Sequence, residues 1–190
     1  MAITSVFLMP PTRQLNMQFH FFFLVVKTNV DYQVVGSFAV QDETTPSITE
    51  ALQFFKDANP FWNPKCFLVD NCEEEIASIA HIFPNCHILL CNFHREQAWE
   101  RWLSLTSHDM RSVKDQALVF LRKIADSESE EQYLKNVKEL KEAVLWKSDS
   151  SGKFRDYIDK TWLPVHKKWV KAYRIVTSSM NFYENIKTDL

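Results

Sequence analysis

The chain has 190 residues, of which 46% are hydrophobic and 24% charged, a composition typical of one globular domain or one domain with an insertion. Only two residues are glycine, Gly36 and Gly152, which excludes a Walker A loop and a dinucleotide-binding fingerprint. The net charge of −2 divides into −6 over residues 1–100 (5 Lys/Arg against 11 Asp/Glu) and +4 over residues 101–190 (17 against 13). This asymmetry is compatible with an acidic metal-holding part and a basic accessory part, and equally with chance variation between solvated faces.

The four cysteines do not indicate a secreted disulfide protein. The chain is long and apolar enough to fold without disulfides, and its first residues, which include Pro10 and Pro11, lack the basic region of a secretion signal. The longest apolar run, residues 19–26, has eight residues including His20, far short of the roughly 20 that span a membrane. We therefore expect an intracellular, reduced protein without a membrane segment.

The first half of the chain predicts alternating strands and helices. Residues 1–18 show no period and predict an irregular lead-in. Two aromatic and β-branched runs, 19–27 and 32–40, predict antiparallel strands, and Gly36 indicates a bulge or a close backbone approach. A helix with a capping box at Ser47 and Glu50 follows and ends at Asn59-Pro60. We then expect a strand at 66–70, a helix at 73–83, a strand at 87–91 and a helix opening near His94.

The second half predicts helices only. Helical periods cover 110–126, 128–146 and 153–173, the last split at Pro164. The expected fold class is α/β: a mixed sheet flanked by helices, with an all-helical insertion before the last helix. In terms of domain organisation, we expect a lead-in at 1–18, an α/β core at 19–105, a helical insertion at 106–177 and a last helix at 178–190.

Asp70 is the first candidate site residue. It ends a buried strand, and the carboxyl ends of strands are the usual location of sites in α/β sheets. A carboxylate there can hold a divalent cation. The alternative is that Asp70 or Asn71 only caps the following helix.

A C-x-x-H motif, Cys91-Asn92-Phe93-His94, follows the next parallel strand and should lie near Asp70. One interpretation is a zinc site completed by Cys72, Cys86 or His87. The other is a buried cysteine beside a helix-start histidine that makes local hydrogen bonds.

A basic segment without acids spans residues 160–174. Its cations are Lys160, Lys167, Lys168, Lys171 and Arg174, and the aromatic residues Trp162, Trp169 and Tyr173 lie between them. Such a combination can grip a nucleic-acid backbone and stack on bases, with Trp169 as a stacking residue. The alternative is an amphipathic helix with tryptophans in the core and lysines in solvent.

The ordered run of these elements over residues 21–103 resembles the MULE (Mutator-like element) transposase domain. The shared features are paired strands, a helix led by ETTPSI, a strand ending in Asp70, an acidic helix ending Phe-Pro, and a strand ending in C-x-x-H before an AW-containing helix. The segment TSSMNFYENIK resembles the polar stretch before that family's last catalytic acid, here Glu184. The resemblance implies an RNase H-like fold interrupted by a helical insertion.

The resemblance also implies the chemistry of a transposable element: DNA recombination by two-metal phosphoryl transfer, with three carboxylates in DDE order holding Mg²⁺ or Mn²⁺. Asp70 and Glu184 would be catalytic metal ligands, with Cys91 and His94 beside them. The first acid, which should end a strand before residues 19–27, has no counterpart, because no Asp or Glu precedes Asp31.

We therefore expect a truncated, inactive DDE-type transposase core that does not bind its metals and binds DNA weakly and without sequence preference. The resemblance places such a protein in the nucleus and is compatible with a homo-oligomer. The alternatives are a domesticated, non-catalytic DNA- or protein-binding module on the same fold, or an unrelated helical interaction protein with a small α/β part.

Overall fold

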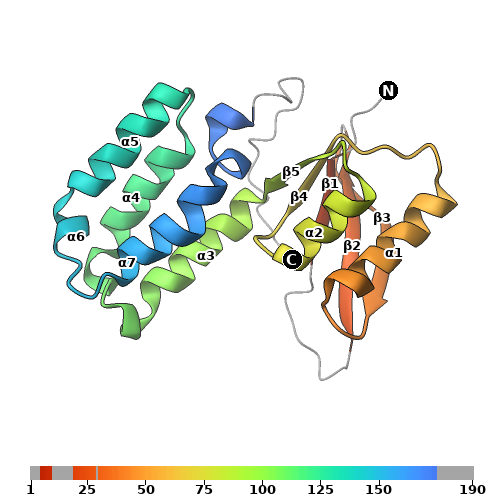
Figure 1. Ribbon diagram of the computed structural model, residues 1–190, viewed down its shortest axis with the longest axis horizontal. Coiled ribbons are helices and arrows are strands. Elements are labelled where there is room, and N and C mark those ends of the chain that lie inside the picture. The colour runs from red at the N-terminus through yellow and green to blue at the C-terminus, as the bar shows by residue number, and fades with distance from the viewer. Residues whose placement is uncertain (1–4, 10–18, 29, 175–190) are drawn as a thin grey trace. The chain divides into compact units, whose positions relative to one another are not determined.

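The computed structural model describes residues 5–9, 19–28 and 30–174 (Figure 1). The chain divides into two compact units between Cys91 and Asn92. The first is an α/β unit and the second is helical, so the α/β core ends at residue 91 and not at 105 as expected. Among the described residues, no helix combines the length and the apolar character that crossing a bilayer requires.

A five-stranded mixed sheet forms the α/β unit, in the order β3-β2-β1-β4-β5. β2 and β3 pair antiparallel, as predicted, and β4 and β5 are parallel neighbours. The strands are β1 (Ser5–Met9), β2 (His20–Lys27), β3 (Tyr32–Val40), β4 (Cys66–Val69) and β5 (His87–Leu90). The mixed α/β class expected from the sequence is confirmed.

The expected irregular lead-in is wrong for residues 5–9, which form the central strand β1. β1 pairs antiparallel with β2, where Met9 lies opposite Phe23, and parallel with β4, where Phe7 lies opposite Leu68. Five residues, four of them apolar, are too few to show a period, and the strand is stabilised by backbone hydrogen bonds to neighbours that are distant in sequence.

Two helices belong to the α/β unit, α1 (Thr45–Ala58) and α2 (Glu73–Ile82). The predicted capping box at Ser47 is wrong: Thr44 is the N-cap, and its hydroxyl accepts a hydrogen bond from the Ser47 N–H at 3.5 Å. The helix begins earlier than expected because Pro46, whose missing N–H is tolerated in a first turn, lies inside it. α1 buries Ile48 and Leu52 in the core.

The helical unit begins at Asn92. Its α-helices are α3 (Asn92–Ser104), α4 (Lys114–Ala125), α5 (Glu130–Glu142), α6 (Val144–Lys147) and α7 (Lys153–Asp156). After α7 the chain continues as a π-helix over Tyr157–Trp162 and a 3₁₀ segment over Leu163–Lys168, so the helical pattern changes next to Pro164, where a split was predicted. The expected last helix, 178–190, lies outside the described residues.

Three buried tryptophans form the centre of the helical unit. Trp99, Trp162 and Trp169 contact one another edge to face, with ring centroids 5.4–6.0 Å apart. The buried guanidinium of Arg95 lies 4.8 Å from the centroid of the Trp99 ring, a cation–π arrangement, and donates to the carbonyl oxygen of Trp169 at 3.2 Å. These contacts tie α3 to the segment that follows Pro164.

Gly36 lies at the position where β3 meets α1. The pairing of β2 with β3 shifts between Leu24 and Val25, so both features predicted for this glycine, a bulge and a close approach, are present. A Cβ atom at residue 36 would lie 2.8 Å from Cζ of Phe55 and would clash with the ring.

We expect Gly36→Ala to lower the free energy of unfolding by about 1–3 kcal/mol, because the added methyl group overpacks the contact with Phe55. Urea unfolding of the two proteins measures the difference. Ser37→Ala, at an exposed neighbouring position, is the control and should change stability by less than about 0.5 kcal/mol. Equal stabilities of Gly36→Ala and Ser37→Ala would contradict the packing argument.

Candidate functional site

Asp70 directly follows β4 at the carboxyl ends of the parallel strands, as predicted. Val69 lies opposite Leu90, and the Cys91 N–H donates to the Val69 carbonyl oxygen at 2.8 Å, so Asp70 and Cys91 leave neighbouring strands side by side. Asp70 is half-buried and Cys91 is buried. The alternative that Asp70 or Asn71 caps α2 is wrong, because the N-cap of that helix is Cys72.

The strand on the other side of β4 brings no acid to this edge. β1 and β4 are in parallel register, with Phe7 opposite Leu68. Continuing this register by two residues brings Met9 level with Asp70. In a DDE site the first acid would stand at the end of this strand, but the chain has Met9 there, followed in sequence by Pro10.

Of the other two predicted site residues, His94 lies within the described residues and Glu184 does not. His94 lies in the first turn of α3, half-buried, with its ring 5.3 Å from that of Phe93. Glu184 lies outside the described residues, so its proximity to Asp70 stays a prediction.

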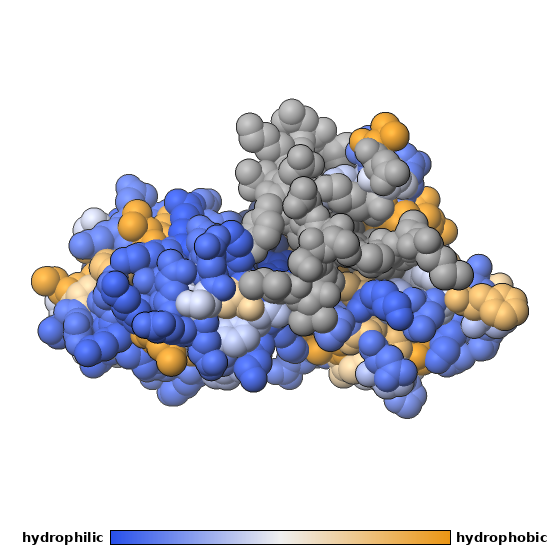
Figure 2. Space-filling model, turned by 90° about the horizontal axis from the view of Figure 1, so that it is seen from above, coloured by the Kyte–Doolittle hydropathy of each residue, from blue (hydrophilic) through white to orange (hydrophobic). Residues whose placement is uncertain are grey.

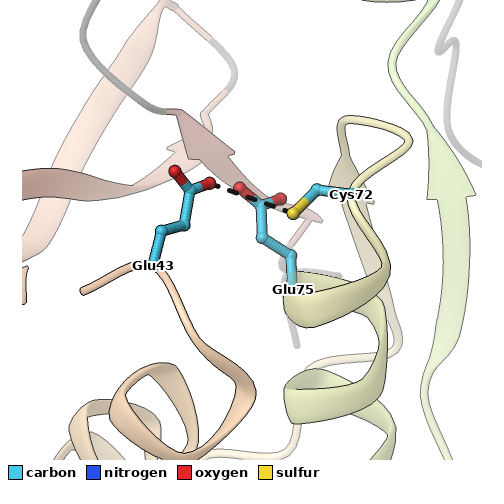
Figure 3. A group of neighbouring side chains, drawn as sticks. All are labelled: Glu43, Cys72 and Glu75. Carbon is cyan, nitrogen blue, oxygen red and sulfur yellow. Dashed lines mark hydrogen bonds between the residues drawn. The ribbon is translucent and has the colours of Figure 1, made fainter.

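A different group of metal-binding side chains lies near the start of α2 (Figure 3). Glu43, Cys72 and Glu75 each offer a ligand atom within 4.8 Å of the others, and their side chains point toward one another. Glu43 comes from the loop before α1 and forms an ion pair with His20 at 3.3 Å, whereas Glu75 is fully buried in the first turn of α2. It is the one such group among the described residues, and it does not contain the Cys91 and His94 of the proposed zinc site.

The Cys72 thiol stays protonated in this environment. Burial raises its pKa to about 12, helped by a hydrogen bond to Glu74 and by the charge of Glu75. Its Sγ lies 3.2 Å from Oε2 of Glu74 and 3.9 Å from Oε1 of Glu43, so the thiol donates to a carboxylate. Cys72 could be a metal ligand only if its thiol lost the proton, and with the thiol protonated the group is an acidic hydrogen-bonded cluster.

Sequence reasoning missed Glu43 and Glu75. The three consecutive acids Glu73 to Glu75 all fit the pattern of solvated acids at a helix start. The helical period, however, places Glu75 on the same face as Ser78, Ile79 and Ile82, which are all buried. This spacing could have predicted that Glu75 is buried. No comparable signal marks Glu43, whose position depends on how the loop after β3 folds.

Both tryptophans of the basic segment lie in the core, whereas Tyr173 is half-buried. Trp169 is 1% exposed and its indole N–H donates to the Trp162 carbonyl oxygen at 2.9 Å, so the prediction that Trp169 stacks on bases is wrong. Trp162 is also buried. The alternative interpretation, with tryptophans in the core, holds here because the ring cluster with Trp99 needs both side chains.

Three of the five cations contact protein groups. Lys160 pairs with Asp156 at 2.8 Å, and Lys171 pairs with Glu128, whose pKa it lowers. Arg174 donates to the side-chain oxygen of Asn92.

The remaining two cations are Lys167, which is exposed, and Lys168, which is half-buried. Within the described part of the chain neither forms an ion pair. On the face drawn in Figure 2 the helical unit, at the left, is mostly hydrophilic, with apolar residues in small separate groups. Lys167 and Lys168 are therefore the two cations of this segment that could contact phosphate groups without breaking an ion pair or hydrogen bond within the described part of the chain.

Residues 6–89 match a family model described as the RNaseH-like domain of zinc finger SWIM domain-containing protein 1/3. The matched segment spans most of β1 and β5, all of β2 to β4, and both α1 and α2. It supports an RNase H-like fold for the α/β unit. No curated protein matches the chain.

We expect Cys72 in the folded chain to react with iodoacetamide at pH 8 at least about 100-fold more slowly than in the urea-unfolded chain. The raised pKa leaves little thiolate, which is the reacting form. Peptide mass spectrometry measures the rate at each cysteine. Glu74→Gln should speed the reaction at Cys72 by lowering its pKa, and Glu73→Gln, an exposed acid in the same turn, should not. Equal rates in folded and unfolded chains would contradict this account.

We expect Lys167→Glu/Lys168→Glu to weaken binding to random duplex DNA by about tenfold or more at low salt, because binding with fewer phosphate contacts releases fewer counterions. Fluorescence anisotropy at several salt concentrations measures the affinity. Lys135→Glu/Lys147→Glu, at exposed positions of α5 and α6, changes the net charge equally and is the control. If both double variants lose the same affinity, the 160–174 segment has no special part in binding.

Proposed function

We propose that this chain is a catalytically inactive RNase H-like module derived from a DDE-type transposase core of the Mutator-like family. One observation carries the proposal: the residue of β1 level with Asp70 is Met9. Two-metal strand cleavage requires carboxylates that clamp both cations. A thioether is a soft ligand and does not replace a carboxylate for Mg²⁺ or Mn²⁺.

The donor set does not fit two resident cations. Asp70 offers one carboxylate at the strand edge, and Glu184 would add a second by resemblance only. Mg²⁺ prefers six oxygen ligands and keeps several waters when few carboxylates are available. We therefore propose that neither Mg²⁺ nor Mn²⁺ is a resident cofactor here and that no reaction proceeds through a metal pair.

A second candidate role, DNA binding, is favoured by Lys167 and Lys168. They lie in a segment without acids and form no ion pair within the described residues. Two cations provide weak contact with the phosphate backbone and no base recognition. We propose that any such DNA binding is independent of base sequence. A DNA-binding role also implies that the protein acts in the nucleus.

The proposal is tested by incubating the purified chain with supercoiled plasmid and Mg²⁺ or Mn²⁺. We expect no nicking above the level of Asp70→Asn, because without an acid at the end of β1 the two-metal site lacks one of its three carboxylates. Asp115→Asn, an exposed acid in the first turn of α4, is the matched control. Metal-dependent nicking that Asp70→Asn abolishes and Asp115→Asn retains would show that another residue supplies the missing ligand.

A gain-of-function variant tests the register itself. Met9→Asp restores an acid level with Asp70 and should tighten Mn²⁺ binding measured by calorimetry. Adding Asp70→Asn should remove the gain. If Met9→Asp leaves Mn²⁺ binding unchanged, the end of β1 is not beside Asp70 and the argument from Met9 fails.

A further inference from the structure

An open groove of about 860 Å³ runs between the two helices of the α/β unit. Its lining comes from α1 and α2 alone, and neither Asp70 nor the acidic cluster of Glu43, Cys72 and Glu75 takes part. The groove is lined by Thr45, Pro46, Thr49, Glu50, Gln53, Phe54, Asp57, Ala77, His81 and Ile82.

Apolar side chains give the groove a surface that water solvates poorly. Phe54 is 70% exposed although it lies in the middle of α1. The exposed Pro46 and Ala77 add aliphatic surface, whereas Ile82 is buried against the core at the base of the groove. Phe54 thus lies in an apolar patch with Pro46 and Ala77, and such a patch, unlike a single exposed side chain, is typical of a surface where a partner binds.

Both charged groups that line the groove on α1 are acidic. Glu50 and Asp57 are seven residues apart and therefore lie on the same face of α1, on either side of Phe54. Asp57 is kept in place by a hydrogen bond from the Gln53 amide at 2.6 Å. α2 contributes His81.

The nearest cation on α1 does not neutralise this charge. Lys56 donates to the carbonyl oxygen of Ile82 at 2.7 Å, at the end of α2, and is not among the lining residues. The groove thus contains two acids and no lysine or arginine. Such a surface repels phosphate groups, which argues against nucleic acid as its occupant.

We propose that the groove between α1 and α2 binds a basic amphipathic helix of a partner protein. Apolar residues spaced by three or four positions would contact Phe54 and Ala77, and Lys or Arg on the flanks would pair with Glu50 and Asp57. The 14 residues of α1 extend over about 21 Å at 1.5 Å per residue, long enough for three to four turns of a bound helix. This inference does not depend on the proposed lack of catalysis at Asp70, and it would hold equally if that site were active.

The test uses a phage-displayed library of 16-residue random peptides selected on the full chain. We expect the enriched peptides to carry Lys or Arg beside apolar residues at helical spacing. A synthetic copy of the most enriched peptide is then titrated by fluorescence anisotropy. Phe54→Ala should weaken its binding by about tenfold or more, as truncation of a central aromatic contact does. Glu50→Lys/Asp57→Lys should weaken it by a similar factor at low salt.

The matched control is Phe61→Ala, which removes the same side chain at a position that is 99% exposed and outside the groove. It should leave the affinity unchanged, and thermal unfolding checks that all variants stay folded. The proposal is overturned by enriched peptides without basic residues, by binding that Phe54→Ala and Phe61→Ala reduce equally, or by a selection without groove-dependent peptides. Plasmid nicking by the same variants is a separate readout, since the groove and Asp70 share no residue.

Discussion

The α/β unit depends on β1 being paired along both of its edges. β1 joins the antiparallel pair β2–β3 to the parallel pair β4–β5, and in the described sheet no other strand connects the two. Two-stranded pairs are marginal by themselves, so five residues with a neighbour on each side unite the sheet. The same strand decides the chemistry of the edge, because its register with β4 determines that Met9, and not an acid, stands level with Asp70.

Much of this sheet could be predicted from the sequence, and the exception has a physical cause. β2, β3, β4 and β5 lie within one or two residues of their predicted bounds, since each has a clear aliphatic or aromatic pattern between turn residues. β1 has no such flanking pattern. Its pairing partners are distant in sequence, 14–20 residues away on β2 (Phe23–Val26) and 61 residues away on β4 (Cys66–Leu68), and only the fold brings them beside it. Non-local pairing of this kind leaves no periodic trace in a short segment.

The candidate site was harder to predict than the fold, because burial decides what a side chain can do. Trp169 has the neighbours of a base-stacking residue in sequence, yet the edge-to-face cluster with Trp99 and Trp162 removes it from the surface. Glu75 has the sequence context of a solvated helix-start acid, yet the face that it shares with Ile79 is buried. For both residues the sequence shows the type of side chain, an aromatic ring or a carboxylate, but its solvent exposure depends on packing between helices and strands.

The irregularity in β3 has a consequence for self-association. β3 is an edge strand of the described sheet, nine residues long, and exposes Val34 and Val35, so its outer backbone edge resembles a template for another extended chain. Val34 lies opposite Val25 and Gly36 opposite Leu24, which leaves Val35 as an extra residue without a place in the ladder. A strand arriving from a second molecule would lose its hydrogen-bond register at this residue. The bulge thus allows two apolar residues to stay at the edge while it opposes growth of the sheet from one molecule into the next.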